Sequence, residues 1–425
     1  MILFLNNNNY NGKSEKEYMS HKVIIVGAGP VGLLLANLLG SKNIEILIIE
    51  KELTRNPWSK AIGITPPSLE ILDNLNLAQI FIKEGVIGRK AVFYGNSLRL
   101  GALTIKRIPS KFPFLLSLSQ ATTEKILENN LKKYPSVTLL RGYNVFNIKS
   151  NLEGYLIECF NSQELKAYSF SSEFICACDG EKSTIRKLVK IPFTGYFFKP
   201  TFIMGDYYDK TPFEEAAILW FTNKGSIESF PLPNKSRRWI IQTSKFIATP
   251  EEGFLENIIF KRAGISLSRE EKISQNSFGV QKFLANSYWR EKVFLCGDSA
   301  HTMPPIGGQG MNTGFADAEF LGYIISSYLK NPKLKLKILA NKYEFYRKNA
   351  AKSATLRANI GMRVGTARNS LISLIRSLIL TILLHLPISR IIVPFFTMLN
   401  IPYNRLYKVL QKENLIRSAL KQYIE

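Results

Sequence analysis

Residues 296–312 read CGDSAHTMPPIGGQGMN and gather a carboxylate, a histidine, two prolines and four glycines in one stretch. The apolar run KVFLC before Asp298 is typical of a buried strand, so Asp298 stands where a strand ends and can bind the hydroxyls of a polyol. Gly307, Gly308 and Gly310 begin a helix with unhindered backbone N–H groups, which stabilise an anion. The sequence therefore predicts a hydroxyl-binding carboxylate beside an anion-binding helix start.

A second glycine-rich turn lies near the start of the chain, where residues 27–32 read GAGPVG. An apolar run precedes the turn, a helical pattern follows it, and a second apolar run ends at Glu50. The glycines let the backbone approach a pyrophosphate, whose charge meets the helix N-terminus, and Glu50 can accept hydrogen bonds from a ribose. The pattern predicts a dinucleotide site without separating FAD from NAD.

A third motif, CDGEKSTIRK at residues 178–187, carries Asp179, Ser183 and Arg186. Asp-Gly after a strand is also a common structural turn, so the motif alone favours a structural reading. Ser183 and Arg186 are three residues apart on the helix that follows, and Arg186 could meet a phosphate or orient Asp179.

Together the three motifs resemble those of the single-component flavoprotein aromatic hydroxylases, the family of p-hydroxybenzoate hydroxylase, whose fingerprints are GxGxxG, DGxxSxxR and GDAAHxxxPxxGxGxN. The resemblance covers about residues 22–330. It implies an extended FAD, with the adenosine ribose at Glu50, the pyrophosphate over residues 27–32, the ribityl chain at Asp298 and the isoalloxazine against residues 307–312. The cofactor-binding residues that it implies are Gly27, Gly29, Pro30, Val31, Gly32, Glu50, Lys51, Lys60, Gln120, Asp179, Arg186, Asp298, Gly308, Gly310, Met311 and Asn312.

The resemblance also implies an activity. NADPH or NADH would reduce FAD, O2 would add to give a flavin C4a-hydroperoxide, and one oxygen would pass to an aromatic, quinone-like or polyketide-like small molecule. Pro304 and Gly307 would form the wall beside the flavin. The alternatives are a membrane-associated hydroxylase of a quinone precursor and a flavin-binding redox sensor or reductase. A halogenase ranks low because its Trp-x-Trp-x-Ile-Pro signature is missing from the sequence.

Some residues depart from the family pattern or stay unassigned. Lys60 stands where the family often has an arginine, and lysine loses bidentate geometry. His301 is expected to be a hydrogen-bonded structural group and is not assigned to catalysis. No catalytic base is assigned, because Tyr207, Tyr208 and Arg238 are as well explained as core or surface residues.

The order of apolar and helical patterns predicts the elements that must position these motifs. Strand–helix–strand units alternate with a β-rich central part, which predicts an α/β fold: a discontinuous FAD-binding Rossmann-like domain with a β-rich substrate-domain insertion and a C-terminal helical region. The predicted ranges are 1–20 for a disordered extension; 21–80, 115–195 and 288–330 for the FAD-binding domain; 81–114 and 196–287 for the substrate domain; and 331–425 for the basic helical region.

Composition limits the remaining possibilities. The 425 residues are 46% hydrophobic and 21% charged, as in a globular protein. The four cysteines have no paired or metal-type spacing, which favours reduced thiols in a cytoplasmic protein, and three histidines make a metal site improbable. No nucleic-acid-binding module is recognisable.

The formal charge of +23 is uneven, and the sequence has no acidic residue between Glu344 and Glu413. This basic segment contains the apolar runs 371–387 and 391–399, too short for an ordinary membrane-spanning helix. The pattern fits a helical cap packed on the protein, or peripheral contact of residues 371–405 with an anionic membrane at its inner face.

Overall fold

The computed structural model of the chain describes residues 20–55, 61–96, 98–105, 108–150, 154–305, 307–385 and 389–413. The expected extension at residues 1–20 lies outside these ranges except for Ser20, and Lys60 also lies outside them.

The first sheet is built on parallel strands that are buried on both faces. β1 (Ser20–Val26) pairs in parallel with β2 (Ile46–Glu50) and with β11, which in turn pairs in parallel with β18. The full order is β17-β18-β11-β1-β2-β8, with β10 and β9 attached to β11 as an antiparallel meander. The other strands are β8 (Val137–Arg141), β9 (Tyr143–Ser150), β10 (Tyr155–Asn161), β11 (Lys166–Ala177), β17 (Trp289–Arg290) and β18 (Val293–Leu295).

The second sheet has the order β19-β16-β12-β15-β14-β13-β5-β6. Its strands are β5 (Lys90–Tyr94), β6 (Arg99–Thr104), β12 (Phe193–Tyr208), β13 (Ala217–Thr222), β14 (Gly225–Leu232), β15 (Ser236–Thr243), β16 (Lys272–Ala285) and β19 (His301–Thr302). A small third sheet, β3-β7-β4, consists of β3 (Gly63–Ile64), β7 (Leu115–Ser117) and β4 (Val86–Gly88). The two large sheets draw on alternating parts of the chain, and the residues at which one domain gives way to the other stay a prediction.

Within the described ranges residues 406–413 are helical, and ten further α-helices carry labels. They are α1 (Pro30–Gly40), α2 (Pro66–Asp73), α3 (Ala78–Glu84), α4 (Gln120–Leu131), α5 (Thr184–Leu188), α6 (Phe254–Ala263), α7 (Gln309–Lys330), α8 (Leu336–Thr366), α9 (Ser370–His385) and α10 (Ser389–Phe396), with short 3-10 turns η1 (Arg269–Glu271) and η2 (Gly297–Ser299). The predicted α/β class with a helical C-terminal region is confirmed.

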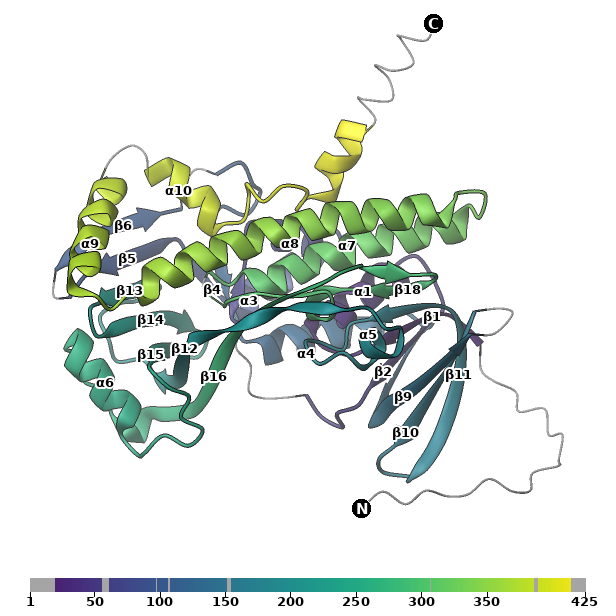
Figure 1. The fold of residues 1–425 in the computed structure, drawn as a ribbon, viewed down its shortest axis with the longest axis horizontal. Coiled ribbons are helices and arrows are strands. Elements are labelled where there is room, and N and C mark those ends of the chain that lie inside the picture. The colour runs from purple at the N-terminus through teal and green to yellow at the C-terminus, as the bar shows by residue number, and fades with distance from the viewer. Residues whose placement is uncertain are drawn as a thin grey trace, which may run out of the picture.

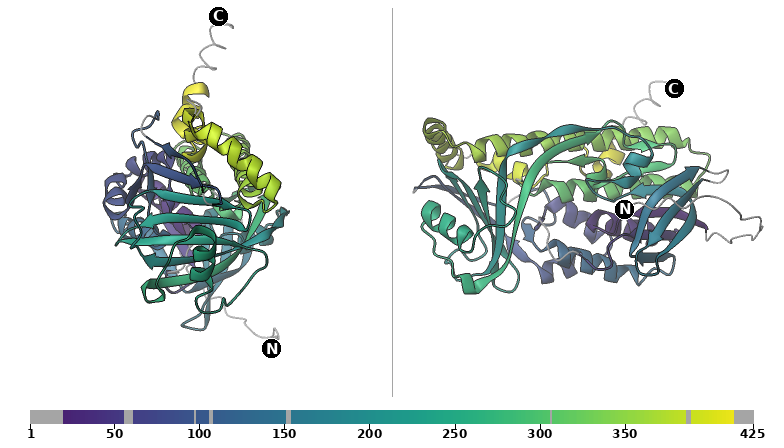
Figure 2. Two further views of the ribbon diagram at one scale, coloured as in Figure 1. Left: turned by 90° about the vertical axis from the view of Figure 1, so that its left-hand side faces the viewer. Right: turned by 60° about the horizontal axis from the view of Figure 1, so that its bottom comes forward.

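The two sheets lie at opposite ends of an elongated molecule, and α7 and α8 run side by side along it (Figure 1). α6 covers the outer face of the second sheet, whereas α9 and α10 lie on its other side, next to β5, β6 and the end of α8 (Figures 1 and 2). The largest apolar core surrounds the first sheet, with smaller clusters on each face of the second.

The cysteines are free thiols, as the sequence predicted. Cys159, Cys176 and Cys296 are buried and Cys178 is half-buried. Burial raises the pKa of the Cys159 thiol to about 12, which makes it unreactive near neutral pH.

Candidate functional site

The GAGPVG turn joins β1 to α1 and has a shape that only glycine permits. Gly27 has φ +104°, and a Cβ there would collide with the Cys178 carbonyl group. A Cβ at Gly32 would collide with the Gly27 carbonyl oxygen. Gly29 instead faces open space, with no atom within 4 Å of where its Cβ would be. The turn is therefore packed against protein at Gly27 and Gly32 and open at Gly29, where a ligand can approach the backbone.

α1 presents an uncapped N-terminus to that open side. Its N-cap is Gly29, no side chain accepts a hydrogen bond from the first turn, and Pro30 occupies the first helical position. The free N–H groups and the positive end of the helix dipole form an anion site. The donor set and the cradle fit a pyrophosphate.

Glu50 is fixed beside this turn at the end of β2. Its Oε2 accepts a hydrogen bond of 2.7 Å from the Ala28 N–H, and its Oε1 accepts one of 2.9 Å from the Glu52 N–H. The carboxylate keeps free lone pairs for hydroxyl donors. Lys51, which the resemblance also implied, points to solvent and pairs with Glu52 at 3.6 Å.

The third motif packs directly on the first. Gly297 and Gly314 both contact the region of Val31, where an added Cβ would lie 3.1 Å and 2.6 Å from its Cγ2 atom. Asp298 is exposed in the turn η2, between buried Gly297 and Ser299. The strand end thus holds the Asp298 carboxylate at the surface next to α1.

Ser299 replaces an alanine of the family pattern and ties this turn to the first sheet. Its Oγ donates to the Ala177 carbonyl at 2.6 Å and accepts from the Cys296 N–H at 2.9 Å. The substitution therefore adds hydrogen bonds in a fully buried place.

α7 begins with two consecutive glycines in the left-handed region, Gly307 at φ +83° and Gly308 at φ +63°. No side chain caps the helix, so the N–H groups of Gln309, Gly310 and Met311 have no intrahelical partner. With Gly308 as the N-cap, the Asn312 N–H is the first that can bond within the helix, so Gln309, Gly310 and Met311 form the free set.

The Asn312 side chain instead fastens the start of α7 to β3. Its Nδ2 donates to the Gly63 carbonyl at 2.8 Å and to the Gly308 carbonyl at 2.6 Å. Its Oδ1 accepts from the N–H and the hydroxyl of Thr65, at 2.9 and 3.1 Å. Both ends of the carboxamide are used, so Asn312 positions the helix start.

The second motif also holds the site together. Ser183 is the N-cap of α5 and accepts a hydrogen bond from the Arg186 N–H. The Arg186 guanidinium donates to the Ser299 and Glu181 carbonyls at 2.8 Å and lies 3.8 Å from the centre of the Phe193 ring. Arg186 is therefore bound to protein and links the second motif to the third. Asp179 accepts from the Ile185 N–H through Oδ2, and its buried Oδ1 has no partner.

The sequence model of the FAD binding domain family matches residues 20–358, most of the chain. The chain belongs to the FAD-binding domain family. It is similar to an uncharacterized aromatic compound monooxygenase of Bacillus subtilis, with 28% identity over 73% of this chain and 62% of that protein. It is also similar to a rifampicin monooxygenase of Streptomyces venezuelae, with 26% identity over 72% of this chain and 64% of that one. The matches thus span less than two thirds of these relatives.

Solved structures share the fold of this FAD-binding protein. The p-nitrophenol 4-monooxygenase of Pseudomonas putida superposes with a TM-score of 0.81 at 20% identity, covering 90% of this chain and 99% of that one. An anhydrotetracycline hydroxylase of Streptomyces rimosus gives a TM-score of 0.73 at 24% identity, covering 90% of this chain and 76% of that one. At these identities the likeness establishes the architecture.

The residues present fit FAD on structural grounds. The open backbone over Gly29 suits the pyrophosphate, and the carboxylates of Glu50 and Asp298 suit ribose and ribityl hydroxyls. At the start of α7, the buried Gln309 Oε1 lacks a partner beside the free N–H groups. The assignment of individual residues to parts of FAD stays a prediction.

His301 belongs to the buried support of this FAD-binding site. Its Nε2 lies 2.6 Å from Asp317 Oδ2, and Arg347 donates to the other oxygen of Asp317 at 2.7 Å. The three side chains are fully buried. Burial raises the pKa of Asp317, but the charges of His301 and Arg347 and their hydrogen bonds outweigh it and hold the pKa below its ordinary value. The expected hydrogen-bonded role of His301 is confirmed.

Other predicted residues lie around the site. Gln120 is the first residue of α4 and donates to Glu124 Oε1 at 2.8 Å. Pro304 is buried and Pro305 exposed in the loop before α7. Tyr207 is a core residue that donates to Glu256 at 2.9 Å, and Tyr208 lies at the surface. Both fit the explanation as core or surface residues that the sequence also allowed.

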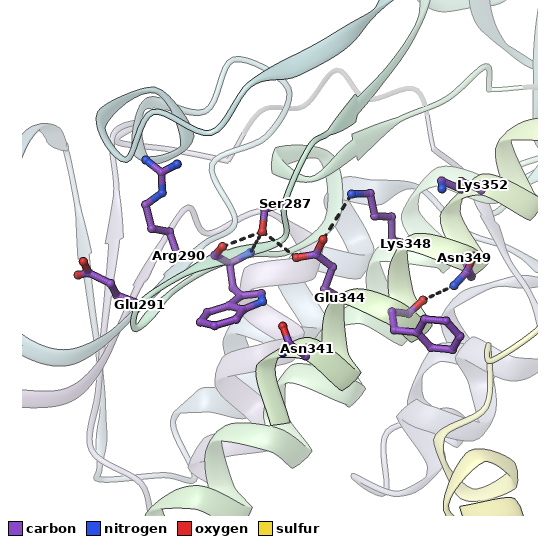
Figure 3. A pocket seen from close by; sticks show the side chains of 10 residues that line it. Ser287, Arg290, Glu291, Asn341, Glu344, Lys348, Asn349 and Lys352 are labelled. Carbon is purple, nitrogen blue, oxygen red and sulfur yellow. Dashed lines mark hydrogen bonds and ion pairs between the residues drawn. The ribbon is translucent and has the colours of Figure 1, made fainter. Parts of the chain in front are cut away.

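The hollow of about 620 Å³ drawn in Figure 3 lies between the β17 region and α8 and contains none of the motif residues. In it, Glu344 accepts hydrogen bonds from the Ser287 hydroxyl at 2.7 Å and the Tyr288 N–H at 3.1 Å (Figure 3). Its charged side chains are of both signs and its carboxylate is satisfied, so we do not assign it as the cofactor site. No group of three or more His, Cys, Asp or Glu side chains suited to a metal ion occurs in the described part of the chain.

Proposed function

We propose that the protein is an FAD-dependent monooxygenase that uses NAD(P)H and O2 to hydroxylate an aromatic or polyketide-like small molecule. The observation that carries this proposal is the convergence of the three motifs on one site, whose last loop leads from β19 of the second sheet into α7. The names of the similar proteins support the reaction class. Because the matches span less than two thirds of those relatives, the activity of this chain is a proposal, and the experiment below tests it.

Bound FAD would supply the redox chemistry that activates O2. The protein's own part is to bind and to orient. The α1 N-terminus would hold the pyrophosphate, Asp298 would hold the ribityl chain, and the free N–H groups at the start of α7 would stabilise negative charge on the reduced ring. Buried Pro304 would help to exclude water there.

The purified protein should be yellow and retain FAD. NAD(P)H consumption should rise when a substrate is present, across a panel of phenols, quinone precursors and polyketides. The product should carry one oxygen from isotopically labelled O2. A protein that never binds flavin would refute the proposal, and consumption indifferent to every compound would favour a redox sensor.

A second, finer proposal concerns membrane contact, and α9 is the observation that favours it. The helix buries two polar side chains near its start and leaves most of its apolar side chains exposed, although Leu380 and Leu384 pack against the second sheet. Ser373 and Arg376 are buried, whereas Leu374 is 68% exposed and Leu378 62% exposed. The exposed apolar face of α9 consists of Leu371, Ile372, Leu374, Ile375, Leu378, Ile379 and Ile382.

Arg376 fixes this orientation. Its guanidinium donates to the Val364 and Ala367 carbonyls, both at 3.1 Å, and to the Phe221 carbonyl on β13 at 2.5 Å. Rotating α9 to bury its leucines would break these bonds and leave a buried cation unpaired, which is costly. The exposed apolar face is therefore built into the fold.

An anionic bilayer suits this face better than a second copy of the chain. Leu356, Ile360 and Val364 form a second exposed apolar stripe at i, i+4 and i+8 of α8. In the sequence, exposed Arg363 lies next to this stripe and exposed Arg368 lies between it and α9. With no acidic residue between Glu344 and Glu413, two copies would meet cation to cation, whereas anionic lipid complements the charge. No described helix is by itself long and apolar enough to cross a membrane; α8 and α9 pass a length and composition test only as a pair bent by 120°.

Membrane contact is tested by sedimentation with vesicles of phosphatidylglycerol and phosphatidylcholine. We expect the wild type to pellet and a Leu374→Ser/Leu378→Ser variant to stay in solution. A matched Leu53→Ser/Leu165→Ser variant, changed at exposed leucines near the first sheet, should pellet like the wild type. Equal sedimentation of all three proteins would refute the role of α9, and a concentration-dependent dimer lost in the first variant would favour a second copy.

A further inference from the structure

β14 has a different environment on each face, because side chains alternate along a strand. Ile227 points to the outer face, where it shares an apolar cluster with Trp239 and with Leu255 of α6. Glu228 is the next residue and therefore points to the opposite face, which is turned away from α6 and toward the body of the molecule (Figure 2).

The strand register shows what surrounds Glu228 on that face. Its cross-strand neighbours are Leu219 on β13 and Ile240 on β15, and Ile240 in turn lies opposite Met204 on β12. Met204 and Ile240 pack with Met362 of α8. Glu228 is thus the one charged residue in a row of apolar side chains across these four strands.

The Glu228 carboxyl group has no partner. It is 8% exposed, and no hydrogen bond or ion pair joins it to any residue that the structure describes. Burial alone raises its pKa to about 7. An unpaired buried carboxyl destabilises a fold, so its presence points to a ligand that completes it.

A chain of contacts connects this strand with the start of α7. Asn312 bonds the Gly63 carbonyl of β3, Gly63 pairs with Ser117 of β7, and the Ser117 hydroxyl donates to the Pro231 carbonyl of β14 at 2.5 Å. Pro231 lies three residues after Glu228, about 10 Å along the strand. Glu228 is therefore separated by only about the length of a small aromatic molecule from Pro231, where β14 meets β7. Through β7 and β3 this point is connected to the start of α7.

We propose that Glu228 binds the ionisable hydroxyl of the substrate and takes its proton. In this step the O–H bond of a phenol breaks, a new O–H bond forms on the Glu228 carboxylate, and the electron pair stays on the phenolate oxygen. No oxidant or reductant is needed. The phenolate is the more electron-rich form and thus the better acceptor of an oxygen atom. This inference rests on the proposed monooxygenase function and names its substrate class as phenols or enols.

The other charged groups on elements packed against β14 are already accounted for. β13, β4 and β7 carry none. On β15, Arg238 forms two hydrogen bonds with Asp206, at 2.7 and 2.8 Å, and Arg237 pairs with Asp209 on the outer face at 2.7 Å. α6 carries Glu256, Lys261 and Arg262, and the last turns of α8 carry Arg357 and the exposed Arg363. The charged residues earlier in α8 are Lys337, Lys342, Glu344, Arg347, Lys348 and Lys352.

The test uses oxidised, FAD-loaded protein and 4-nitrophenol, whose ionised form absorbs visible light. Binding is measured by difference spectroscopy from roughly pH 6 to pH 9, a range that includes the raised pKa of Glu228, about 7. In the wild type the affinity should fall with rising pH, because a carboxylate and a phenolate repel each other. In Glu228→Gln the amide carries no charge and this repulsion is absent. The ratio of the wild-type to the Glu228→Gln dissociation constant for 4-nitrophenol should therefore change by at least about tenfold across this range.

Two further variants separate this role from a structural one. Glu228→Leu should also lose the pH-dependent repulsion. Glu256→Gln, at a buried carboxyl on the outer face, should keep the wild-type profile. Each variant is first checked for FAD content and circular dichroism.

The same pH profile in wild type, Glu228→Gln and Glu228→Leu would overturn the proposal, as would a wild type that does not bind 4-nitrophenol at any pH. Failure of the monooxygenase function is read separately, from NAD(P)H consumption and oxygen incorporation, because the binding experiment needs no turnover.

Discussion

Asp298 shows how the fold exposes one carboxylate without making it mobile. Its neighbours Gly297 and Ser299 are buried, and Ser299 is bonded to the first sheet, so the turn between them is fixed. A ligand hydroxyl would therefore meet a carboxylate whose backbone is already fixed.

At this residue we predict that Asp298→Ala weakens FAD binding by about 1–3 kcal/mol, since one charge-assisted hydrogen bond is lost. The dissociation constant should rise roughly 5- to 150-fold, measured by fluorescence titration of the apoprotein with FAD. Asp73→Ala, which removes only a surface ion pair with Lys111, is the control and should bind FAD normally. Unchanged affinity in Asp298→Ala would contradict the assigned role.

The burial of Glu228 should make the stability of the protein depend on pH. Because burial raises its pKa from 4.5 to about 7, folding favours the protonated form. Its contribution to stability is fully present below the ordinary pKa and is lost as the pH rises through about 7. Glu228→Leu should therefore be more stable than the wild type by on the order of 3 kcal/mol at about pH 8, and the gap should close near pH 4–5. Thermal unfolding of both proteins across this range measures it; a gap that does not depend on pH would argue against a buried unpaired carboxyl.

Sequence could predict the residues whose role follows from local spacing. The glycines of the first turn, Glu50 and Asp298 each stand at a strand end that an apolar run indicates. Two other residues depend on distant partners. Asn312 bonds Gly63, 249 residues away, and Glu228 is isolated only because the register sets Leu219 and Ile240 beside it. A single acid within the apolar strand SIESFPL was the available signal for Glu228.

At the scale of elements, α7 joins the site to the core at two points. Its first turn is fastened to β3 by Asn312, and Asp317, further along, bonds His301 and Arg347 in the interior. Arg347 also donates to the Tyr403 carbonyl after α10 at 2.7 Å and to the Thr313 carbonyl at 3.1 Å. One guanidinium thus binds α7, α8 and the C-terminal segment together.

We predict that Arg347→Met destabilises the protein by about 3–5 kcal/mol, because it removes the cation that pairs with the buried Asp317 and leaves Asp317 Oδ1 and two carbonyls without this donor. The midpoint of thermal or urea unfolding should fall and FAD should dissociate earlier. Arg368→Met, at an exposed position, should leave the midpoint unchanged. Equal midpoints for the two variants would show that the buried network contributes little.

The orientation of α9 is an element-scale feature that the sequence left open. The run LISLIRSLILTILLH predicts an amphipathic helix, but periodicity cannot say which side faces the protein. The choice depends on carbonyl groups at the end of α8 and on β13, which accept hydrogen bonds from Arg376. Both the packed cap and the membrane contact were compatible with the sequence, and the structure shows a cap with its apolar side outward.

At the scale of the whole molecule, charge and apolar surface act together. The chain carries a net +23, and the acid-free segment includes α9 and α10, which lie at one end of the elongated fold (Figure 1). Anionic lipid would attract this end before apolar contact is made.

We therefore predict that sedimentation with anionic vesicles weakens as NaCl rises from about 0.05 to about 0.5 M, over which the screening length shortens severalfold. Neutral phosphatidylcholine vesicles should retain less protein at every salt concentration. Binding that is independent of both salt and lipid charge would mean that the apolar face of α9 acts without electrostatic attraction.

The alternation of the two sheets along the chain was predictable at coarse scale, because strand-like runs and helical patterns succeed one another visibly. The pairing order was not, since β13 pairs in parallel with β5, more than 100 residues earlier, and antiparallel with its neighbour β14. Such long-range pairing is set by how the apolar faces fit together.

The four hydrogen bonds of Asn312 fix the start of α7 against β3 without any cofactor. Gly63, Thr65 and Gly308 are held in place by protein alone. These described residues need no ordering when FAD binds, so they should add no coupled-folding contribution to the heat-capacity change of association. Apoprotein stripped of its flavin should accordingly keep this arrangement and rebind FAD without refolding these residues.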